Sequence, residues 1–220
     1  MEITPDNFFT YIQPINFYLL FTLFFAVWKL DKAQTDNKLL LSLLALMVVT
    51  EIVCITSIIN GYRSGISLAY NFSMPLHNII WLYILYRNIN MKLLTKFLGI
   101  VYLLFTVSTN LFQESLSEFN NYLMIVGAFI YLVLFITESF YELQKENFAF
   151  FTSNKFILLF SPILFFLGFS IGFGFQSSAL LEKELFGFKL YDLISHFVNI
   201  VYYSLMNIYI YNEKRIKSGE

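Results

Sequence analysis

Charged residues are scarce in this chain of 220 residues, because only 13% are Asp, Glu, Lys or Arg. Soluble domains carry about a quarter charged residues, so the composition argues against an ordinary water-soluble fold. Hydrophobic residues make up 58% of the chain, and the formal net charge of −1 gives no support for nucleic-acid binding. The single cysteine, Cys54, excludes an intrachain disulfide and a cysteine metal cluster.

Basic residues are missing from the N-terminus, where no Lys or Arg precedes Lys29. A cleavable signal peptide has a basic start and a small-residue cleavage site, and neither pattern is present. The first apolar segment is therefore expected to remain as a helix.

Long polar loops are also missing, and apolar runs of about 20 residues fill most of the chain. A run of that length crosses a hydrocarbon core of about 30 Å as a helix, which satisfies its own backbone hydrogen bonds in lipid. The sequence thus predicts an all-α membrane protein whose single transmembrane domain, residues 1–220, is a bundle of seven helices. The predicted spans are residues 11–29, 39–59, 66–86, 93–112, 120–141, 156–178 and 190–211.

Lys and Arg are unequally distributed between the two ends of this bundle. Eleven accompany the first, third and fifth connections and the C-terminal tail, whereas the other end has only Arg63, Lys183 and Lys189. Positive residues concentrate on the cytoplasmic side, so we predict a bacterial inner-membrane protein with its N-terminus outside and its C-terminus inside. Aromatic residues near the predicted inner ends indicate an interfacial belt, although so aromatic a chain also places them everywhere. They are Trp28, Trp81, Tyr83, Tyr86, Tyr209 and Tyr211.

Two similar hexapeptides raise the hypothesis of an internal repeat. NIIWLY runs from Asn78 to Tyr83 in the third span, and NIVYYS runs from Asn199 to Ser204 in the seventh. With the fourth span as a connector, the chain would have a 3+1+3 arrangement of parallel repeats, as in some transporters. A sequence with this biased composition also yields such matches by chance.

Polar residues inside membrane spans mark candidate functional positions, because lipid does not solvate them. In the seventh span, at 100° per residue, five polar side chains share a stripe about 80° wide. They are Asp192, His196, Asn199, Tyr203 and Asn207. The stripe should face the bundle interior, either as the wall of a ligand pocket or ion path or as hydrogen bonds that only hold helices together.

The second and third spans add four candidates. Asn71, His77 and Asn78 flank Pro75, which removes a helical hydrogen bond and can open a kink. Glu51 lies in the middle of the second span and needs a polar partner from another helix. Together with the stripe these residues form the candidate ligand-binding site or polar core, and no catalytic residue is assigned. His77, His196 and Asp192 are the candidate metal ligands, but no metal, haem or other cofactor is predicted.

Partial resemblances to three known families suggest other functions. Seven helices with an external N-terminus resemble rhodopsins, but the lysine that holds retinal is absent from the seventh span. Ser73-x3-His77 and Asp192-x3-His196 resemble motifs of the zinc amidohydrolases that include alkaline ceramidases, with Asp192 replacing a histidine. The 3+1+3 layout is similar to that of PQ-loop sugar transporters, although Gln13-Pro14 has the reverse order and the fifth span lacks proline.

Across its whole length the chain resembles the small uncharacterised bacterial seven-helix proteins that accompany sensor histidine kinases or resemble their membrane-embedded sensor regions. The resemblance rests on Glu51, on the Asn and His residues of the third span, and on the run NIVYYSL in the seventh. It implies a non-enzymatic sensor or signalling protein that binds a small apolar, amphipathic or lipid-like ligand between spans two, three, six and seven. A membrane or cytoplasmic partner would receive the signal. The alternatives are a small-solute transporter and an intramembrane metal-dependent hydrolase that uses His77 and His196.

Overall fold

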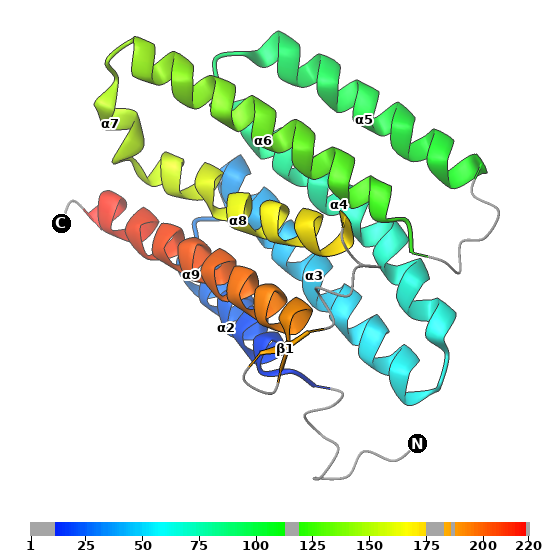
Figure 1. Cartoon of the computed structure of the whole chain (residues 1–220). Helices are drawn as coiled ribbons and strands as arrows, with labels where there is room; N and C mark the ends of the chain where they lie inside the picture. The colour runs from blue at the N-terminus through cyan, green and yellow to red at the C-terminus, as the bar shows by residue number, and fades with distance from the viewer. Residues whose placement is uncertain (1–11, 113–118, 175–182, 186–187, 219–220) are drawn as a thin grey trace.

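The computed structural model describes residues 12–112, 119–174, 183–185 and 188–218 (Figure 1). The helices are α2 (Pro14–Lys29), α3 (Thr35–Ile59), α4 (Arg63–Asn88), α5 (Lys92–Phe112), α6 (Asn121–Gln144), α7 (Phe148–Phe151), α8 (Asn154–Gly174) and α9 (Leu190–Ser218). Two-residue strands, β1 (Glu184–Leu185) and β2 (Phe188–Lys189), pair antiparallel just before α9. The all-α prediction is confirmed for these residues apart from this short hairpin. Each predicted span overlaps one helix. Residue 11 of the first predicted span and residues 175–178 of the sixth lie outside the described residues.

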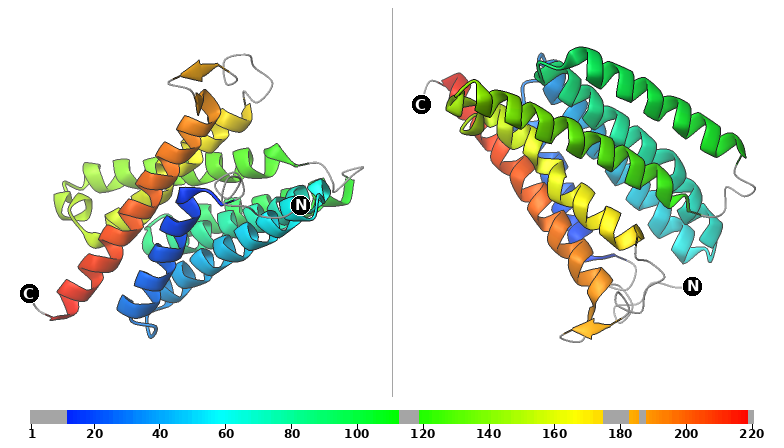
Figure 2. Two further views of the ribbon diagram at one scale, coloured as in Figure 1. Left: turned by 90° about the horizontal axis from the view of Figure 1, so that it is seen from below. Right: turned by 45° about the horizontal axis from the view of Figure 1, so that its top comes forward.

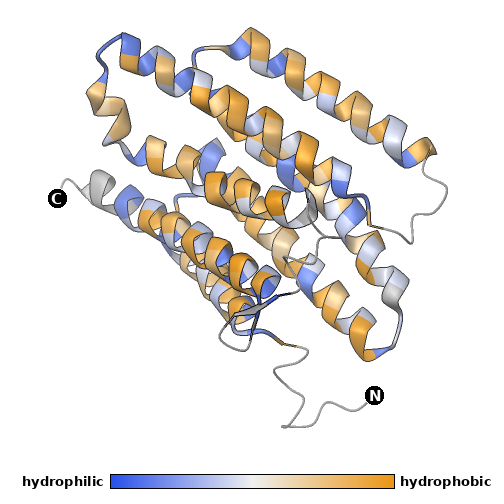
Figure 3. Cartoon of the chain, in the orientation of Figure 1, coloured by the Kyte–Doolittle hydropathy of each residue, from blue (hydrophilic) through white to orange (hydrophobic). Residues whose placement is uncertain are grey.

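Five of these helices are long and apolar enough to cross a membrane: α3, α5, α6, α8 and α9. Helix α2 is apolar but has only 16 residues, and α4 has 26 residues but its apolar sequence is interrupted by polar side chains. Figure 3 shows apolar residues along the length of most helices. Large side chains such as Phe24, Phe129 and Phe197 are more than 60% exposed on the outer surface. Such extensive apolar exposure is expected for helices surrounded by lipid.

Local sequence explains where several helices begin and end. Pro14 opens α2, where its missing N–H has no helical partner to lose. Helix α3 ends at Ile59. Gly61, two residues later, has a φ of +70°, a conformation that favours glycine. The Gly61 N–H donates to the Ile58 carbonyl and the Tyr62 N–H to the Ser57 carbonyl, which is a Schellman motif. This tight end allows α4 to return antiparallel beside α3.

Six helices form a closed ring of neighbours in the order α2, α3, α4, α6, α8 and α9, with α9 returning to α2. Helix α5 lies outside the ring and packs on α4 and, less extensively, on α6 (Figures 1 and 2). Helices α8 and α9 make the most extensive contact, because Gly168 faces Val198 and leaves no space for a Cβ atom. Similarly, Gly127 of α6 faces the Asn78 side chain of α4.

The proposed aromatic belt is only partly correct. Trp28, Tyr83 and Tyr211 are exposed, as a membrane interface requires, and Tyr86 is half-buried. Trp81 and Tyr209 are instead buried, with 0% and 4% of their surfaces exposed, because both are engaged in hydrogen bonds between helices. A position near a helix end therefore did not distinguish aromatic side chains at the membrane interface from aromatic side chains in the protein core.

Candidate ligand cavity

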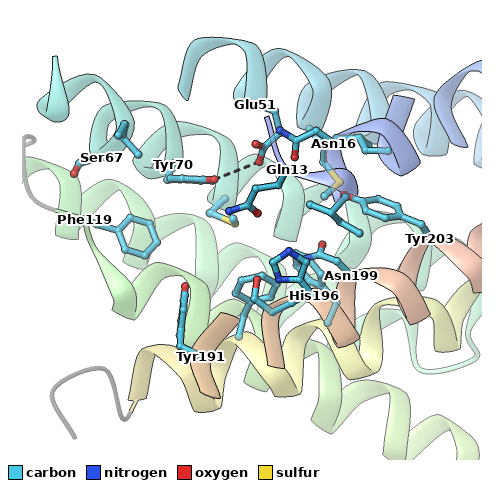
Figure 4. Close-up of a pocket in the computed structure, with 18 residues that line it drawn as sticks. Gln13, Asn16, Glu51, Ser67, Tyr70, Phe119, Tyr191, His196, Asn199 and Tyr203 are labelled. Carbon is cyan, nitrogen blue, oxygen red and sulfur yellow. Dashed lines mark hydrogen bonds between the residues drawn. The ribbon is translucent and has the colours of Figure 1, made fainter. Parts of the chain in front are cut away.

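A cavity of about 350 Å³ lies inside the helix ring, between α2, α3, α4, α8 and α9. Its wall includes residues of the first turns of three helices, Ile15, Ile66 and Tyr191. The cavity therefore reaches the end of the bundle at which α2, α4 and α9 begin. In Figure 4 the labelled side chains converge on this space from several helices. Its volume is at the lower end of the range for small-molecule sites, about 300–1,000 Å³.

Glu51 of α3 provides the carboxylate of the cavity wall. It accepts a hydrogen bond from the Tyr70 hydroxyl of α4 at 3.3 Å, shown as the dashed line in Figure 4. The expectation that Glu51 has a polar partner on a neighbouring helix is thus confirmed. The partner is Tyr70, however, and not one of the Asn, Ser or His residues nearby in that helix. At 3.3 Å the bond is longer than most O–H···O bonds, so the carboxylate keeps most of its capacity to accept.

Helix α9 supplies the opposite wall through three residues of the predicted polar stripe. His196, Asn199 and Tyr203 all line the cavity, and Phe197 and Ile200 on the other face of the helix are exposed. His196 Nδ1 lies 2.7 Å from the Asp192 carbonyl oxygen, and Asn199 donates to the Ser195 carbonyl. These contacts within α9 hold the His196 imidazole and the Asn199 amide close to the backbone of their own helix. Asp192 is half-buried and does not line the cavity.

A small chamber of about 30 Å³ continues from the cavity into the bundle. Glu51, Tyr70, Ser73 and His77 all contribute to its wall. Ser73 Oγ and His77 Nδ1 are buried and have no hydrogen-bond partner in the described chain. Unpaired buried polar atoms cost free energy, and a space of this volume accommodates one water molecule. The chamber therefore suits a water that bonds to Ser73 and His77 beside the Glu51 carboxylate.

His77 connects this chamber to α9. Its Nε2 atom lies 3.0 Å from the Tyr202 hydroxyl, which also accepts a 2.9 Å hydrogen bond from Trp81 Nε1. Phe165 stacks on the Tyr202 ring, with centroids 4.6 Å apart. His77, Trp81 and Tyr202 are all almost fully buried. This cluster joins α4 to α9 immediately below the cavity.

The half of the bundle beyond this cluster is closed by hydrogen bonds between helices. The Tyr18 hydroxyl of α2 lies 2.8 Å from Ser204 Oγ of α9, and Asn207 of α9 donates to Thr22 Oγ1 at 3.0 Å. Tyr209 donates to Asn37 Oδ1 of α3 at 2.8 Å. Asn207, predicted as part of the site, thus holds α9 against α2 at a distance from the cavity.

The remaining predicted residues also join helices outside the cavity. Asn78 donates to the Tyr102 hydroxyl of α5 and to the Leu123 carbonyl of α6. Asn71 Oδ1 accepts from the Asn120 backbone N–H at the start of α6. Of the nine predicted residues, the structure brings four together around the cavity and places His77 just below it. The four are Glu51, His196, Asn199 and Tyr203.

The sequence interpretation missed Tyr70, Ser67 and Ser195 of the cavity wall. Tyr70 was detectable in principle, because it precedes Met74 and His77 by four and seven residues and so shares their helical face. Also missed was a pair of buried carboxylates on α6, Glu138 and Glu142. The Asn90 side chain donates to both, at 2.7 and 2.6 Å, which fastens the turn between α4 and α5 to α6.

Metal ligation was the other chemistry considered for the histidines. His77 faces Tyr202 and the small chamber, whereas His196 faces the larger cavity. The described residues contain no group of three His, Cys, Asp or Glu side chains placed to hold a metal ion.

Comparison with known proteins adds no functional information: no family model, no curated protein and no solved structure matches the chain.

Proposed function

We propose that this chain is a seven-span bacterial membrane sensor that binds a small ligand in the cavity between α2, α3, α4, α8 and α9. One observation carries the proposal: a cavity of about 350 Å³ that combines polar groups from several helices with apolar walls. Small-molecule sites have this composition, in which a few polar groups orient a ligand against an apolar surface. Hydrogen bonds that served only to hold helices together would not require a cavity.

The contacts below the cavity support a signalling role. Glu51 lines both the cavity and the small chamber, and His77 lines the chamber and contacts Tyr202 of α9. A ligand that changes the position of Glu51 or Tyr70 would therefore alter a chain of contacts that ends on α9. Because α9 continues to Ser218 beyond the apolar part of the bundle, a small shift of this helix would reach a partner at its C-terminal end.

Closure of the other half of the bundle favours sensing over transport. Side-chain hydrogen bonds join α9 to α2 and α3 on that side, and Tyr202 and Phe166 are fully buried. A transporter would have to break these contacts to open a second entrance. Transport remains the alternative that the experiment below addresses.

The full topology belongs to the same proposal. We propose that α2 and α4 also cross the membrane, with the N-terminus outside and the C-terminus in the cytoplasm, because eleven of fourteen basic residues then lie inside. The ring of helices supports a 3+1+3 repeat, since α2, α3 and α4 fill one half and α6, α8 and α9 the other, with α5 outside. Trp81 and Tyr202, at corresponding positions of the two hexapeptides, contact each other, as residues near a pseudo-twofold axis do.

A comparison of binding with transport tests the function. Purified protein in lipid nanodiscs would be screened by thermal unfolding with small amines, alcohols, carboxylates and short-chain lipids. We expect at least one class to stabilise the wild type and not a Ser195→Trp variant, in which the cavity is filled. The same compound should show no counterflow in proteoliposomes. Counterflow above that of empty liposomes would establish a transporter instead, and equal stabilisation of the filled variant would exclude the cavity as the site.

A further inference from the structure

The charge of the cavity wall indicates which ligands it accepts. Glu51 is the only carboxylate among the described residues of the wall, and none of those residues is Lys or Arg. An anionic ligand would therefore meet a carboxylate that no Lys or Arg of the described wall offsets, which costs free energy in a partly dehydrated site. A cation would instead form a charge-assisted contact with Glu51, which among the described residues accepts a side-chain hydrogen bond from Tyr70.

Aromatic rings supply a second attraction for positive charge. Tyr70, Tyr191, Tyr203 and Phe165 all contribute to the cavity wall. The faces of such rings carry partial negative charge and bind ammonium groups, most strongly where water is excluded. A carboxylate together with several aromatic rings is the combination that recognises substituted ammonium ions.

The volume and the single carboxylate of the described wall fit an organic molecule better than a bare metal ion. Calcium takes six to eight oxygen ligands, whereas this wall provides one carboxylate surrounded by amides, hydroxyls and apolar groups. A space of about 350 Å³ holds a molecule on the order of ten non-hydrogen atoms.

We propose that the cavity binds a small organic cation, a substituted ammonium ion whose charged group contacts Glu51 and whose apolar substituents contact the surrounding rings. This inference rests on the proposed function and specifies the ligand class of the same cavity. It predicts that charge, rather than size or shape, decides which compounds bind.

Matched compounds separate charge from shape. Choline and 3,3-dimethyl-1-butanol have nearly the same shape, and only choline is charged. Butylammonium and butanol form a second pair. Betaine keeps the trimethylammonium group of choline but has a carboxylate in place of the hydroxymethyl group. Binding of each compound to the protein in nanodiscs would be measured by calorimetry and by thermal unfolding. The variants are Glu51→Gln, which keeps the shape of the side chain, and Glu146→Gln, which changes an exposed carboxylate far from the cavity.

We expect at least one ammonium compound to bind wild type and Glu146→Gln equally, and its affinity for Glu51→Gln to fall at least tenfold. The neutral isosteres and betaine should bind at least tenfold more weakly than their ammonium counterparts. Equal binding of an isosteric pair, or no binding by any ammonium compound, would overturn the cation proposal. Binding of a neutral or anionic compound that Ser195→Trp abolishes would then leave the proposed ligand cavity intact, whereas unchanged binding in Ser195→Trp would remove both proposals.

Discussion

Trp81 on α4 donates a 2.9 Å hydrogen bond from its indole Nε1 to the hydroxyl of Tyr202 on α9, and both side chains are fully buried. The same hydroxyl lies 3.0 Å from His77 Nε2. One oxygen atom thus satisfies polar groups of two residues on α4 and fixes α9 against it. In a lipid environment, where water does not replace a lost partner, this junction should contribute strongly to stability.

Removal of the Tyr202 hydroxyl tests the junction. Tyr202→Phe leaves the indole N–H of Trp81 and the Nε2 atom of His77 without their partner, so we expect the free energy of unfolding to fall by about 1–3 kcal/mol. Tyr211→Phe is the control, because Tyr211 is 56% exposed. Both variants would be compared with wild type by equilibrium unfolding in mixed detergent micelles. Identical stability of Tyr202→Phe and Tyr211→Phe would show that the junction contributes nothing measurable.

A glycine pair tests the packing of α4 against α6. A Cβ atom at Gly127 would overlap the Asn78 amide and approach the Tyr102 ring, whereas a Cβ atom at Gly99 of α5 meets nothing within 4 Å. Gly127→Ala should therefore destabilise the protein by about 1–3 kcal/mol through overpacking. Gly99→Ala should be neutral or slightly stabilising, since alanine favours helices. Thermal unfolding of the two variants in the same detergent measures the difference, which would be absent if α4 and α6 were not in close contact.

Glu51 should matter for stability as well as for binding. Glu51→Ala removes the acceptor of the half-buried Tyr70 hydroxyl, so we expect a loss of about 1–3 kcal/mol. Glu146→Ala, at an exposed position, should melt within error of wild type. Melting temperatures in detergent and in nanodiscs provide the test. If the two alanine variants melt alike in both environments, the polar contact between α3 and α4 has no energetic role.

Much of the fold follows from the sequence because one physical signal, the long apolar run, is strong. Runs of about 20 apolar residues have to be helices in lipid, and each predicted span overlaps a helix of the structure. The order of the helices around the ring does not follow from hydropathy. It depends on close contacts such as that between Gly168 and Val198, which only three-dimensional packing defines.

The candidate site was predictable only in part. The 3.6-residue period places His196, Asn199 and Tyr203 on one face of α9, and all three line the cavity. The same period includes Asn207, but the stripe is longer than the cavity, so Asn207 meets Thr22 of α2 instead. The partner of Glu51 was harder to predict, because Tyr70 and His77 lie on the same face of α4, about 10 Å apart along its axis. The height of α4 relative to α3 decides that Tyr70 meets Glu51.

Topology has its own test in fusions to reporters that are active on one side of the membrane only. Fusions after residues 36, 90, 150 and 216 should report a cytoplasmic location, because eleven basic residues lie in or near these segments. Fusions after residues 62 and 184 should report an external one. If the fusion after residue 150 were external, the seven-span arrangement with an outside N-terminus would be wrong.

Accessibility of the cavity from outside is the most direct test of the central claim, a ligand site that opens at the external end of the bundle. Cys54 would be replaced by alanine, and Ser195 of the cavity wall would be changed to cysteine. The controls are Tyr62→Cys, 61% exposed between α3 and α4, and Glu146→Cys, exposed between α6 and α7. In oriented vesicles, a small membrane-impermeant thiol reagent added outside should modify Ser195→Cys and Tyr62→Cys but not Glu146→Cys. Modification of Ser195→Cys from the inside only, or from neither side while Tyr62→Cys reacts, would contradict the account.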